Sequence, residues 1–392
     1  MRIVKGWCLA GLLALALTGC SMAQGTAASP ETIVARTETT ETLMTITGQD
    51  GVTFDGMLRL PPGETVGKLV LYVNGSGPNT YDNHRSTGDI EFDYFDLLAK
   101  ELTDRGIAFF SYNTRGVTPG NEPPYYANID PVGYSTYLPT NEVGDVEQMI
   151  TALKSQPALR DSKVYLLGWS AGTVIAPLVA KAGEVPVDAL LLCGYMNGTM
   201  EETLLWQQTG GSSMVFYRNY FDTDGSEDIS PEEFEVDPYT IRPYLDGITF
   251  EMLDADENGV LNEQDFAILL ADNRAAVLAA FEGGDDQWLQ DNYGVYLTSA
   301  WYQDYKNVPP NRETLPTLDL PIFIFHGELD PNVSEQGVYD IEEAFQKAGK
   351  TNLTVQVFPG ADHDLNYMQY LYSGQIPDGF RALLDTCAAL PE

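Results

Sequence analysis

Short apolar strands alternate with helices along most of this 392-residue chain, and this rhythm constrains the fold more than any other feature. Strand-like runs rich in Val, Leu, Ile and Phe occupy residues 68–77, 107–116, 163–170, 187–195, 320–330 and 353–363. Helical segments lie at 91–106, 141–156, 171–183, about 334–348 and 377–389. Because parallel strands need a crossover, usually a helix, the pattern predicts a mostly parallel sheet with helices on both faces. Residues 43–61 alternate apolar and polar side chains around Asp50–Gly51 and predict a hairpin.

The rhythm stops between residues 196 and 315, where no core strand can be recognised. We expect a helical insertion there, over the carboxyl ends of the strands where open α/β sheets bind ligands. It divides the core into a first part (41–195) and a second part (316–392). The formal net charge is −36, and residues 222–265 hold 15 acidic residues and one basic residue. This charge argues against nucleic acid as a partner, since phosphates would be repelled.

The N-terminus has the pattern of a targeting segment, which is excluded from fold reasoning. A basic start, MRIVKG, precedes a short apolar run and then Leu17-Thr18-Gly19-Cys20. This tetrapeptide resembles the bacterial lipobox, which implies that residues 1–19 are a lipoprotein signal peptide and that Cys20 is lipidated. An ordinary signal peptide or a short membrane anchor is the alternative, although the run is short for a span. Residues 20–40 are then a flexible tether, and the protein is expected in the bacterial cell envelope, at the outer membrane or cell surface.

Two further cysteines lie in apolar surroundings. Cys193 falls in a strand and Cys387 in a C-terminal helix. An oxidising envelope permits a bridge between them, but the sequence does not place them within bonding reach. Two buried free thiols are the simpler expectation.

Residues 168–172 read Gly-Trp-Ser-Ala-Gly. A G-x-S-x-G match is weak evidence alone, but here a strand precedes it and a helix follows, as a nucleophile turn requires. The glycines permit a tight turn that lifts the serine hydroxyl clear of the sheet, near the positive end of the helix. Ser170 is therefore the candidate nucleophile, and a plain strand-to-helix turn is the alternative.

A serine hydroxyl needs a base to take its proton, and the chain offers three histidines: His84, His326 and His363. His363 directly follows a buried strand, so its loop can point it back over the sheet. The carboxylate that orients this base should follow the preceding strand, where Glu328 and Asp330 stand. Asp330 is the better candidate, although it can also be a plain turn carboxylate, and His363 a structural loop histidine.

The order Ser170, Asp330, His363 is the serine–acid–histidine order of α/β-hydrolases. The segments HGELDPNV and GADHDLN resemble the acid and histidine loops of that superfamily, especially of its secreted esterase and serine-peptidase branches. NGSGP resembles their HGSGP loop, with Asn74 in place of the histidine. The resemblance covers roughly 50–195 and 315–390. It implies the α/β-hydrolase fold, an oxyanion hole formed by the backbone N–H groups of Ser76 and Ala171, and a structural role for Arg115. A plain glycine turn is the alternative for residues 74–78.

Two acidic stretches match the twelve-residue calcium loop, which supplies oxygens at positions 1, 3, 5, 7, 9 and 12. Residues 254–265 match it best, with Gly259 at position 6. Residues 222–233 match it 32 residues earlier, with Glu227 at that position, which implies strain. The expected ligands are Asp254, Asp256, Asn258, the Val260 carbonyl, Asn262 and Asp265 in one loop, and Asp222, Asp224, Ser226, the Asp228 carbonyl, Ser230 and Glu233 in the other.

The two loops resemble a paired EF-hand unit, with Ile229 and Leu261 facing each other across a short antiparallel contact. Asp265 is shorter than the usual closing glutamate, so calcium affinity or selectivity over Mg²⁺ is expected to be lower. Outside the inner membrane calcium is abundant, so even weak sites stay filled, which favours a structural role.

These features together predict a lipid-anchored serine hydrolase that cleaves carboxylic esters through an acyl-enzyme under a calcium-stabilised lid. The expected substrate is a small-molecule ester, without an organic cofactor, and membrane contact is through the N-terminal lipid; the oligomeric state is left open. Trp206, Tyr217, Tyr220, Trp288, Tyr293, Tyr296 and Trp301 either line the substrate pocket or, more simply, form the core of the lid. Alternatives are a serine peptidase of exopeptidase type with the same fold, and a non-catalytic calcium-binding lipoprotein.

Overall fold

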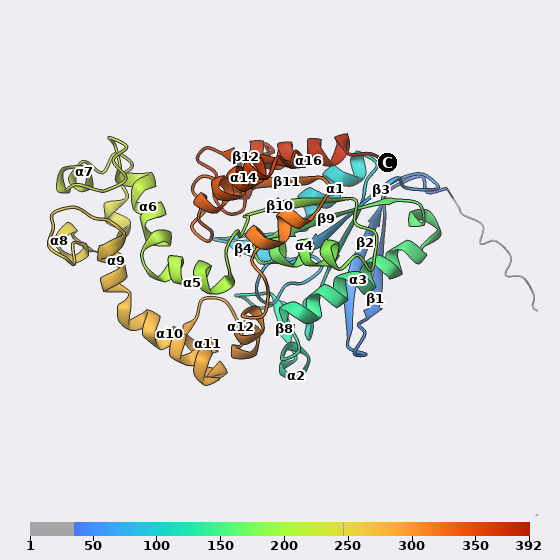
Figure 1. The fold of residues 1–392 in the computed structure, drawn as a ribbon, viewed down its shortest axis with the longest axis horizontal. Helices are drawn as coiled ribbons and strands as arrows, with labels where there is room; N and C mark the ends of the chain where they lie inside the picture. Colours follow the sequence, from blue (N-terminus) through green and yellow to red (C-terminus); the bar gives the residue numbers. More distant parts are fainter. Residues whose placement is uncertain (1–34, 246) are drawn as a thin grey trace, which may run out of the picture. The chain divides into compact units, whose positions relative to one another are not determined.

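The computed structural model describes residues 35–245 and 247–392. Its centre is an eight-stranded sheet of order β1-β2-β6-β3-β9-β10-β11-β12 (Figure 1). The strands are β1 (Thr40–Thr47), β2 (Thr53–Leu60), β3 (Lys68–Val73), β6 (Ala108–Tyr112), β9 (Lys163–Trp169), β10 (Ala189–Cys193), β11 (Ile322–Gly327) and β12 (Leu353–Phe358). The β1–β2 hairpin pairs antiparallel with its neighbours, and from β6 to β12 the strands are parallel. The mostly parallel sheet and the hairpin expected from the sequence are confirmed.

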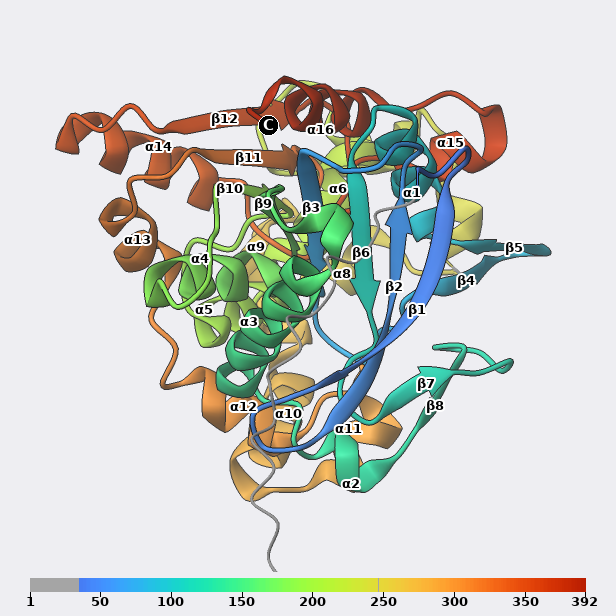
Figure 2. The same ribbon diagram turned by 90° about the vertical axis from the view of Figure 1, so that its right-hand side faces the viewer.

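Alternate residues of the central strands enter two separate cores, which is why both faces of the sheet need helices. In β3, Leu69 and Leu71 join the core under α3 (Pro139–Ser155), α4 (Gly172–Ala182) and α14 (Gln336–Ala348). Val70 and Tyr72 join the opposite core under α1 (Phe95–Asp104) and α16 (Asp378–Ala389). Figure 2 shows α3 and α4 on one side of the strands and α1 on the other.

Several short elements escaped the sequence pattern. Residues 91–93, predicted to begin a helix, belong to β5 (Ile90–Asp93), which pairs with β4 (His84–Thr87). A second ribbon joins β7 (Val117–Pro119) and β8 (Ala127–Ile129). Both ribbons are too short and too polar for an apolar periodicity to show. The remaining elements of the core are α2 (Pro131–Tyr134), α15 (Tyr367–Ser373), and the 3₁₀ turns η1 (Pro157–Leu159) and η3 (Leu315–Thr317).

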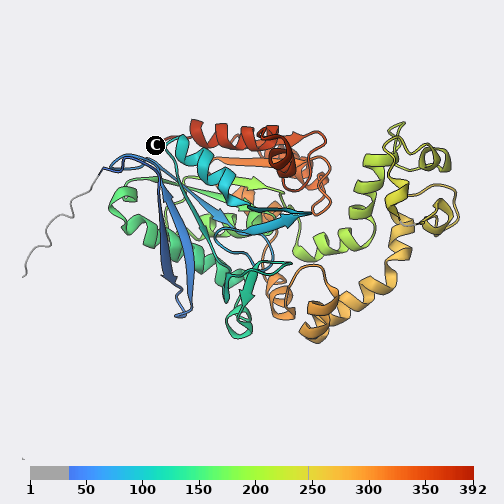
Figure 3. The ribbon, with the colours of Figure 1, turned by 180° about the vertical axis from the view of Figure 1, so that it is seen from behind.

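Segment 196–315 contains helices and no named strand in its described part. These are α5 (Met200–Gln208), α6 (Gly211–Phe221), α7 (Pro231–Val236), η2 (Arg242–Leu245), α8 (Phe250–Leu253), α9 (Glu263–Leu269), α10 (Ala271–Gly283), α11 (Asp286–Asn292), α12 (Ser299–Tyr305) and α13 (Asn311–Thr314). In Figure 3 this segment runs from green through yellow to orange beside the sheet. It has two apolar clusters, one around Trp301 and one around Phe234.

Other features around the sheet bear on the sequence predictions. Arg36 pairs with Gly63 through two main-chain hydrogen bonds of 3.0 and 2.9 Å, so Arg36, which lies within the expected tether 20–40, is attached to the folded core. Arg115 makes hydrogen bonds of 2.5 and 2.6 Å to Asp145 and one of 2.5 Å to Asp50, which confirms its structural role. Cys193 and Cys387 are buried free thiols, as expected.

The segment 1–19, expected to be a signal peptide, and Cys20 lie outside the described residues. Among the helices that are described, none combines the length and apolar character needed to cross a bilayer.

Candidate active site

Ser170 stands in the turn between β9 and α4, with a left-handed φ of 55°. This conformation is strained for a residue with a side chain and costs about 1–3 kcal/mol. The surrounding glycines make the turn possible: a Cβ at Gly168 would lie 2.4 Å from the Gly172 carbonyl oxygen, and one at Gly172 would lie 2.2 Å from that of Val73. The Ser170 N–H donates to the Cys193 carbonyl at 2.9 Å, which fixes the turn against β10.

His363 and Asp330 meet at the ends of β12 and β11. Asp330 Oδ2 lies 2.7 Å from His363 Nδ1, and its Oδ1 accepts the backbone N–H groups of Asn332 at 2.8 Å and Val333 at 3.0 Å. A carboxylate at Nδ1 keeps the proton on that nitrogen, which leaves the Nε2 lone pair available as a base. The ring packs on Gly194, where a Cβ would lie 2.6 Å from His363 Cε1, so a larger residue there would displace the imidazole.

Ser170 and His363 line one cavity of about 330 Å³, together with Ser76. Within the described structure, no hydrogen bond joins the Ser170 hydroxyl to the imidazole. Hydrogen bonds of this kind often tighten only when substrate binds, so the shared cavity is the more informative observation.

The loop after β3 contributes Gly75 and Ser76 to the lining of the same cavity. The Gly75 carbonyl accepts hydrogen bonds from Asn79 Nδ2 at 3.1 Å and from the Tyr137 hydroxyl at 3.4 Å. Because a trans peptide is planar, the N–H of Ser76 points opposite to that carbonyl. Neither this N–H nor that of Ala171 donates to another group of the described chain. Two free amides beside a nucleophile can stabilise an oxyanion.

The other two histidines, His326 and His84, form hydrogen bonds with groups outside the proposed catalytic pair. His326 is fully buried; its Nδ1 accepts the Tyr195 N–H at 3.1 Å and its Nε2 donates to the Val333 carbonyl at 3.2 Å. Burial lowers the pKa of His326 and keeps it neutral. His84 lies with its Nδ1 2.6 Å from Asp93 Oδ1 in the β4–β5 ribbon. Both histidines therefore have structural contacts that account for them.

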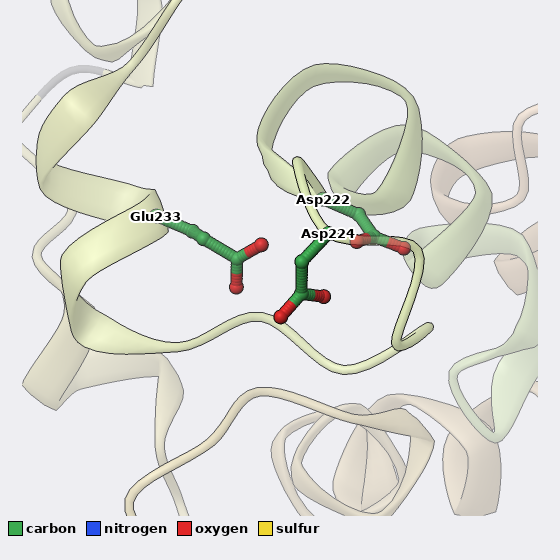
Figure 4. Close-up of side chains that lie close together, drawn as sticks. All are labelled: Asp222, Asp224 and Glu233. Atoms are coloured by element: carbon green, nitrogen blue, oxygen red, sulfur yellow. The ribbon is translucent and has the colours of Figure 1, made fainter.

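The first acidic loop (222–233) and the second acidic loop (254–265) each gather three carboxylates. Asp222, Asp224 and Glu233 offer oxygens that all lie within 4.8 Å of one another, with Glu233 pointing from α7 toward the two aspartates (Figure 4). The second loop brings together Asp254, Asp256 and Asp265 in the same way. Clustered carboxylates, with carbonyl and amide oxygens nearby, suit a hard cation such as Ca²⁺ or Mg²⁺.

The other expected ligands lie in the same loops but form local hydrogen bonds. Ser226 Oγ donates to the Asp228 carbonyl at 2.9 Å, and Ser230 Oγ donates to Glu233 Oε2 at 2.8 Å. In the second loop Asn258 Oδ1 accepts the Val260 N–H at 2.9 Å, and Asn262 Oδ1 accepts the Gln264 N–H at 2.8 Å. The loops meet as expected through Ile229 and Leu261, whose main chains exchange hydrogen bonds of 3.0 and 2.8 Å.

Comparison with known proteins identifies the family. Residues 70–370, most of the chain, match the alpha/beta hydrolase family. The chain belongs to this family. Its α/β-hydrolase sheet is similar to that of a solved lipase in an open form, with a TM-score of 0.50, 16% identity, and coverage of 90% of this chain and 100% of that one. At this identity the likeness concerns the fold.

A curated relative of the α/β-hydrolase chain is the esterase EstD of Thermotoga maritima, 26% identical over 186 residues. The match spans 46% of this chain and 40% of the relative's length.

Burial and charge act in opposite directions on the pKa values of the histidine–aspartate pair in this α/β-hydrolase. Burial raises the pKa of Asp330, but the charge and hydrogen bond of His363, together with His326 and the Asn332 N–H, outweigh it and lower the pKa below its usual value. Burial lowers the pKa of His363, but the Asp330 carboxylate, together with Asp364 and Asp362, outweighs it and raises the pKa above its usual value. The imidazolium is thus stabilised, which suits a base that carries a proton between reaction steps.

Sequence reasoning missed several residues around the α/β-hydrolase cavity. Arg85 in β4 lines it and donates to Asp364 Oδ2 at 3.0 Å, which ties the β4–β5 ribbon to the His363 loop. No periodic pattern marked this short ribbon. Of the aromatic residues proposed for the pocket, Tyr293 and Trp301 line it; Trp206 lines a second cavity, and Tyr217, Tyr220, Trp288 and Tyr296 pack in the two helical clusters.

Proposed function

We propose that this protein is a serine hydrolase that cleaves carboxylic esters. The single observation that best supports this proposal is the cavity shared by Ser170 and His363, with Asp330 hydrogen-bonded to the far side of the imidazole. The similarity to an esterase over part of the chain points to the same reaction.

In the proposed mechanism, Ser170 Oγ attacks the ester carbonyl while His363 Nε2 takes its proton. The carbonyl oxygen becomes an oxyanion beside the amides of Ser76 and Ala171. The imidazolium then protonates the alcohol that leaves, and an acyl-enzyme remains on Ser170. Water, deprotonated by His363, attacks the acyl carbonyl and releases the acid. Asp330 remains ionised and holds the imidazole in one orientation throughout.

An ester substrate fits the cavity better than a peptide does. Met196, Met200, Leu204 and Leu297 give it an apolar wall, and its volume of about 330 Å³ suits a short acyl group. Arg85 places a positive charge in the cavity lining. It pairs with Asp364, which lines the same cavity. A free amino terminus would therefore meet a carboxylate that is already neutralised. Comparing nitrophenyl esters with aminoacyl-naphthylamides distinguishes esterase from exopeptidase activity.

We further propose that the two acidic loops bind Ca²⁺ as a paired EF-hand unit and that the ion stabilises segment 196–315 as a lid. The clustered carboxylates and the Ile229–Leu261 contact support this. Asp222, Asp224 and Glu233 would hold one ion, and Asp254, Asp256 and Asp265 the other, with the remaining loop oxygens completing each shell. The bound ion would neutralise crowded carboxylates, and this segment contributes Trp301 and Leu204 to the cavity wall.

We also propose that Cys20 carries the lipid that anchors the protein in the cell envelope, on the strength of the sequence Leu17–Cys20. Metabolic labelling with a fatty acid should tag the wild type, and Cys20→Ser should abolish the tag and release the protein from membranes. A labelled Cys20→Ser protein would contradict the assignment.

The experiment that tests the function is a panel of nitrophenyl esters of increasing chain length, assayed on wild type and Ser170→Ala, with calcium and with chelator. We expect short esters to be cleaved by the wild type alone. Full activity of purified Ser170→Ala, or no hydrolysis of any ester by the wild type, would contradict the proposal.

A further inference from the structure

Glu142 is a buried carboxylate that the proposed mechanism does not use. It lies in the first turn of α3 with 5% of its surface exposed. One turn further on, Asp145 pairs with Arg115, whereas no ion pair to Glu142 is found in the described residues. In that part of the chain the Glu142 carboxyl has one hydrogen-bond partner, the Tyr112 hydroxyl, which donates to Oε1 at 3.0 Å. A buried acid with a tyrosine as its hydrogen-bond partner calls for a functional account.

Tyr112 connects this carboxyl to the loop that carries the Ser76 amide. Its hydroxyl hydrogen is committed to Glu142, so the oxygen remains as an acceptor, and the Asn74 N–H donates to it at 3.4 Å. The Asn74 side chain donates to the Tyr112 carbonyl at 3.1 Å. The start of the loop is therefore held at two points by one residue, whose hydroxyl orientation depends on Glu142.

A second tyrosine near Glu142 reaches the next peptide of the loop. The Tyr137 hydroxyl donates to the Gly75 carbonyl, which belongs to the same planar peptide unit as the Ser76 N–H. The charge of Glu142 also acts on Tyr137. Glu142 is thus linked to the Asn74 amide through Tyr112, and its charge acts on the tyrosine that holds the Gly75 carbonyl.

The surroundings of Glu142 favour its neutral form. Burial raises the pKa of Glu142 to about 8, and the nearby Asp145 acts in the same direction, while the Tyr112 hydrogen bond and Arg115 oppose it. The titratable groups that face it come from its own helix, from β6 and the turn after it, from the segment before α3 and from α12: Asp145, Tyr112, Arg115, Tyr134, Tyr137 and Tyr305. Arg115 is the positively charged residue among them, and its guanidinium already pairs with the carboxylates of Asp50 and Asp145.

We propose that Glu142 is a positioning residue for the oxyanion-binding loop: its carboxyl holds the Tyr112 hydroxyl, and through it the Asn74 amide, in the arrangement that aims Ser76 N–H at the reacting oxygen. This inference rests on the proposed function. Loss of the proton would put a negative charge behind the amides that must stabilise an oxyanion, and like charges oppose each other strongly in a buried site. Transition-state stabilisation, and therefore kcat, should fall, with little effect on KM.

The test measures ester kcat and KM, together with the rate at which a fluorophosphonate labels Ser170, from about pH 6 to about pH 10. Wild type should lose both rates above about pH 8, approaching a tenfold loss per pH unit. Glu142→Gln, which cannot ionise, should lack this alkaline fall. Tyr112→Phe should lower kcat ~10-fold at unchanged KM, because the Asn74 amide loses its acceptor. Tyr305→Phe is the matched control, since Tyr305 faces Glu142 but does not line the cavity, and it should change neither rate.

The outcomes separate this inference from the proposed function. A wild type that fluorophosphonate does not label at Ser170 contradicts the proposed function itself. Labelled wild type and Glu142→Gln with the same alkaline fall contradict the role of Glu142. Should Glu142→Gln fail to fold, Tyr112→Phe decides: an unchanged kcat, or a loss equal to that of Tyr305→Phe, overturns the proposal.

Discussion

The turns at the carboxyl ends of β9, β11 and β12, which form one edge of the sheet, and the two acidic loops both gather polar side chains. They do so by different physical means. At the edge, glycines let backbone approach backbone, and each charge already has a partner. Asp330, for example, holds His363 and two amides. In each acidic loop three carboxylates converge with only the loop's own N–H groups and hydroxyls to satisfy them. At the edge the charges of Asp330 and His363 pair with each other, whereas the loops keep negative charge that a cation would neutralise.

The two loops also differ from each other in an instructive way. Positions 4 and 6 are left-handed in both: Gly225 and Glu227 in the first loop, with φ of 75° and 70°, and Glu257 and Gly259 in the second, with φ of 57° and 91°. Each loop has one glycine and one strained glutamate, in opposite order. At position 12, Glu233 and Asp265 accept equivalent backbone N–H groups at 2.8–2.9 Å, so the shorter side chain reaches the same place. The same loop geometry is therefore compatible with different sequences.

The largest expected effect separates the edge from the loops. Ser170→Ala should lower kcat/KM for esters by about 10⁴-fold or more, because the nucleophile is lost. Its melting temperature and its response to calcium should match the wild type, since the loops do not depend on the hydroxyl. Steady-state kinetics and thermal denaturation, each with calcium and with chelator, measure both. A changed calcium response in this variant would mean that the two regions are coupled.

The next effect is the dependence of the edge on pH. The base must be neutral to accept a proton, and the pKa of His363 is raised above its usual value of about 6.5. Activity should therefore be lost as pH falls through an apparent pKa above about 6.5, by ~10-fold for each further unit. A profile of kcat/KM against pH measures this value. An apparent pKa well below that of a free histidine would contradict the Asp330–His363 arrangement.

Removal of the cation should affect the loops first. Excess chelator is expected to lower the melting temperature by about 5 °C or more, because a ligand bound only to the folded state stabilises it. Ser170→Ala provides the matched control. Its melting temperature should fall by the same amount with chelator, although the variant has no catalytic activity. Identical melting curves with calcium and with chelator would remove the calcium proposal and leave the hydrolase proposal untouched.

The smallest expected effect compares the loops with each other. Glu227→Gly relieves a strained φ at position 6 and should stabilise the first loop by up to about 1 kcal/mol, whereas Gly259→Ala should destabilise the second by a similar amount. No atom lies within 4 Å of a Cβ at Gly259, so backbone strain alone is tested there. Calcium titration calorimetry and melting temperatures report both changes. Equal effects of the same sign would show that the residue at position 6 does not determine the difference in stability between the two loops.

Predictions from the sequence succeeded where the polar residues of the candidate site follow apolar strands closely along the chain. The positions of Ser170, Asp330 and His363 after the ends of β9, β11 and β12 could be predicted because each strand is apolar and a turn follows it. The fold followed from the same alternation. The roles of these residues in catalysis remain predictions, as does calcium in the loops.

The features that escaped prediction depend on tertiary packing. Glu142 occupies a helical position at which a glutamate normally faces water, and only the packing of Tyr112 against it reveals its burial. Arg85 enters the cavity from a four-residue strand that carries no apolar pattern. Which tryptophans of segment 196–315 line the cavity depends on how its short helices dock, which periodicity does not encode.

The pairing of Arg36 with Gly63 bears on where the enzyme can work. It fastens the chain to the folded body 16 residues after Cys20. Even fully stretched, that many residues reach ~55 Å at most. If Cys20 is embedded in lipid, the hydrolase stays within that distance of the membrane surface. Its substrates would then be esters that are bound to this surface or diffuse along it.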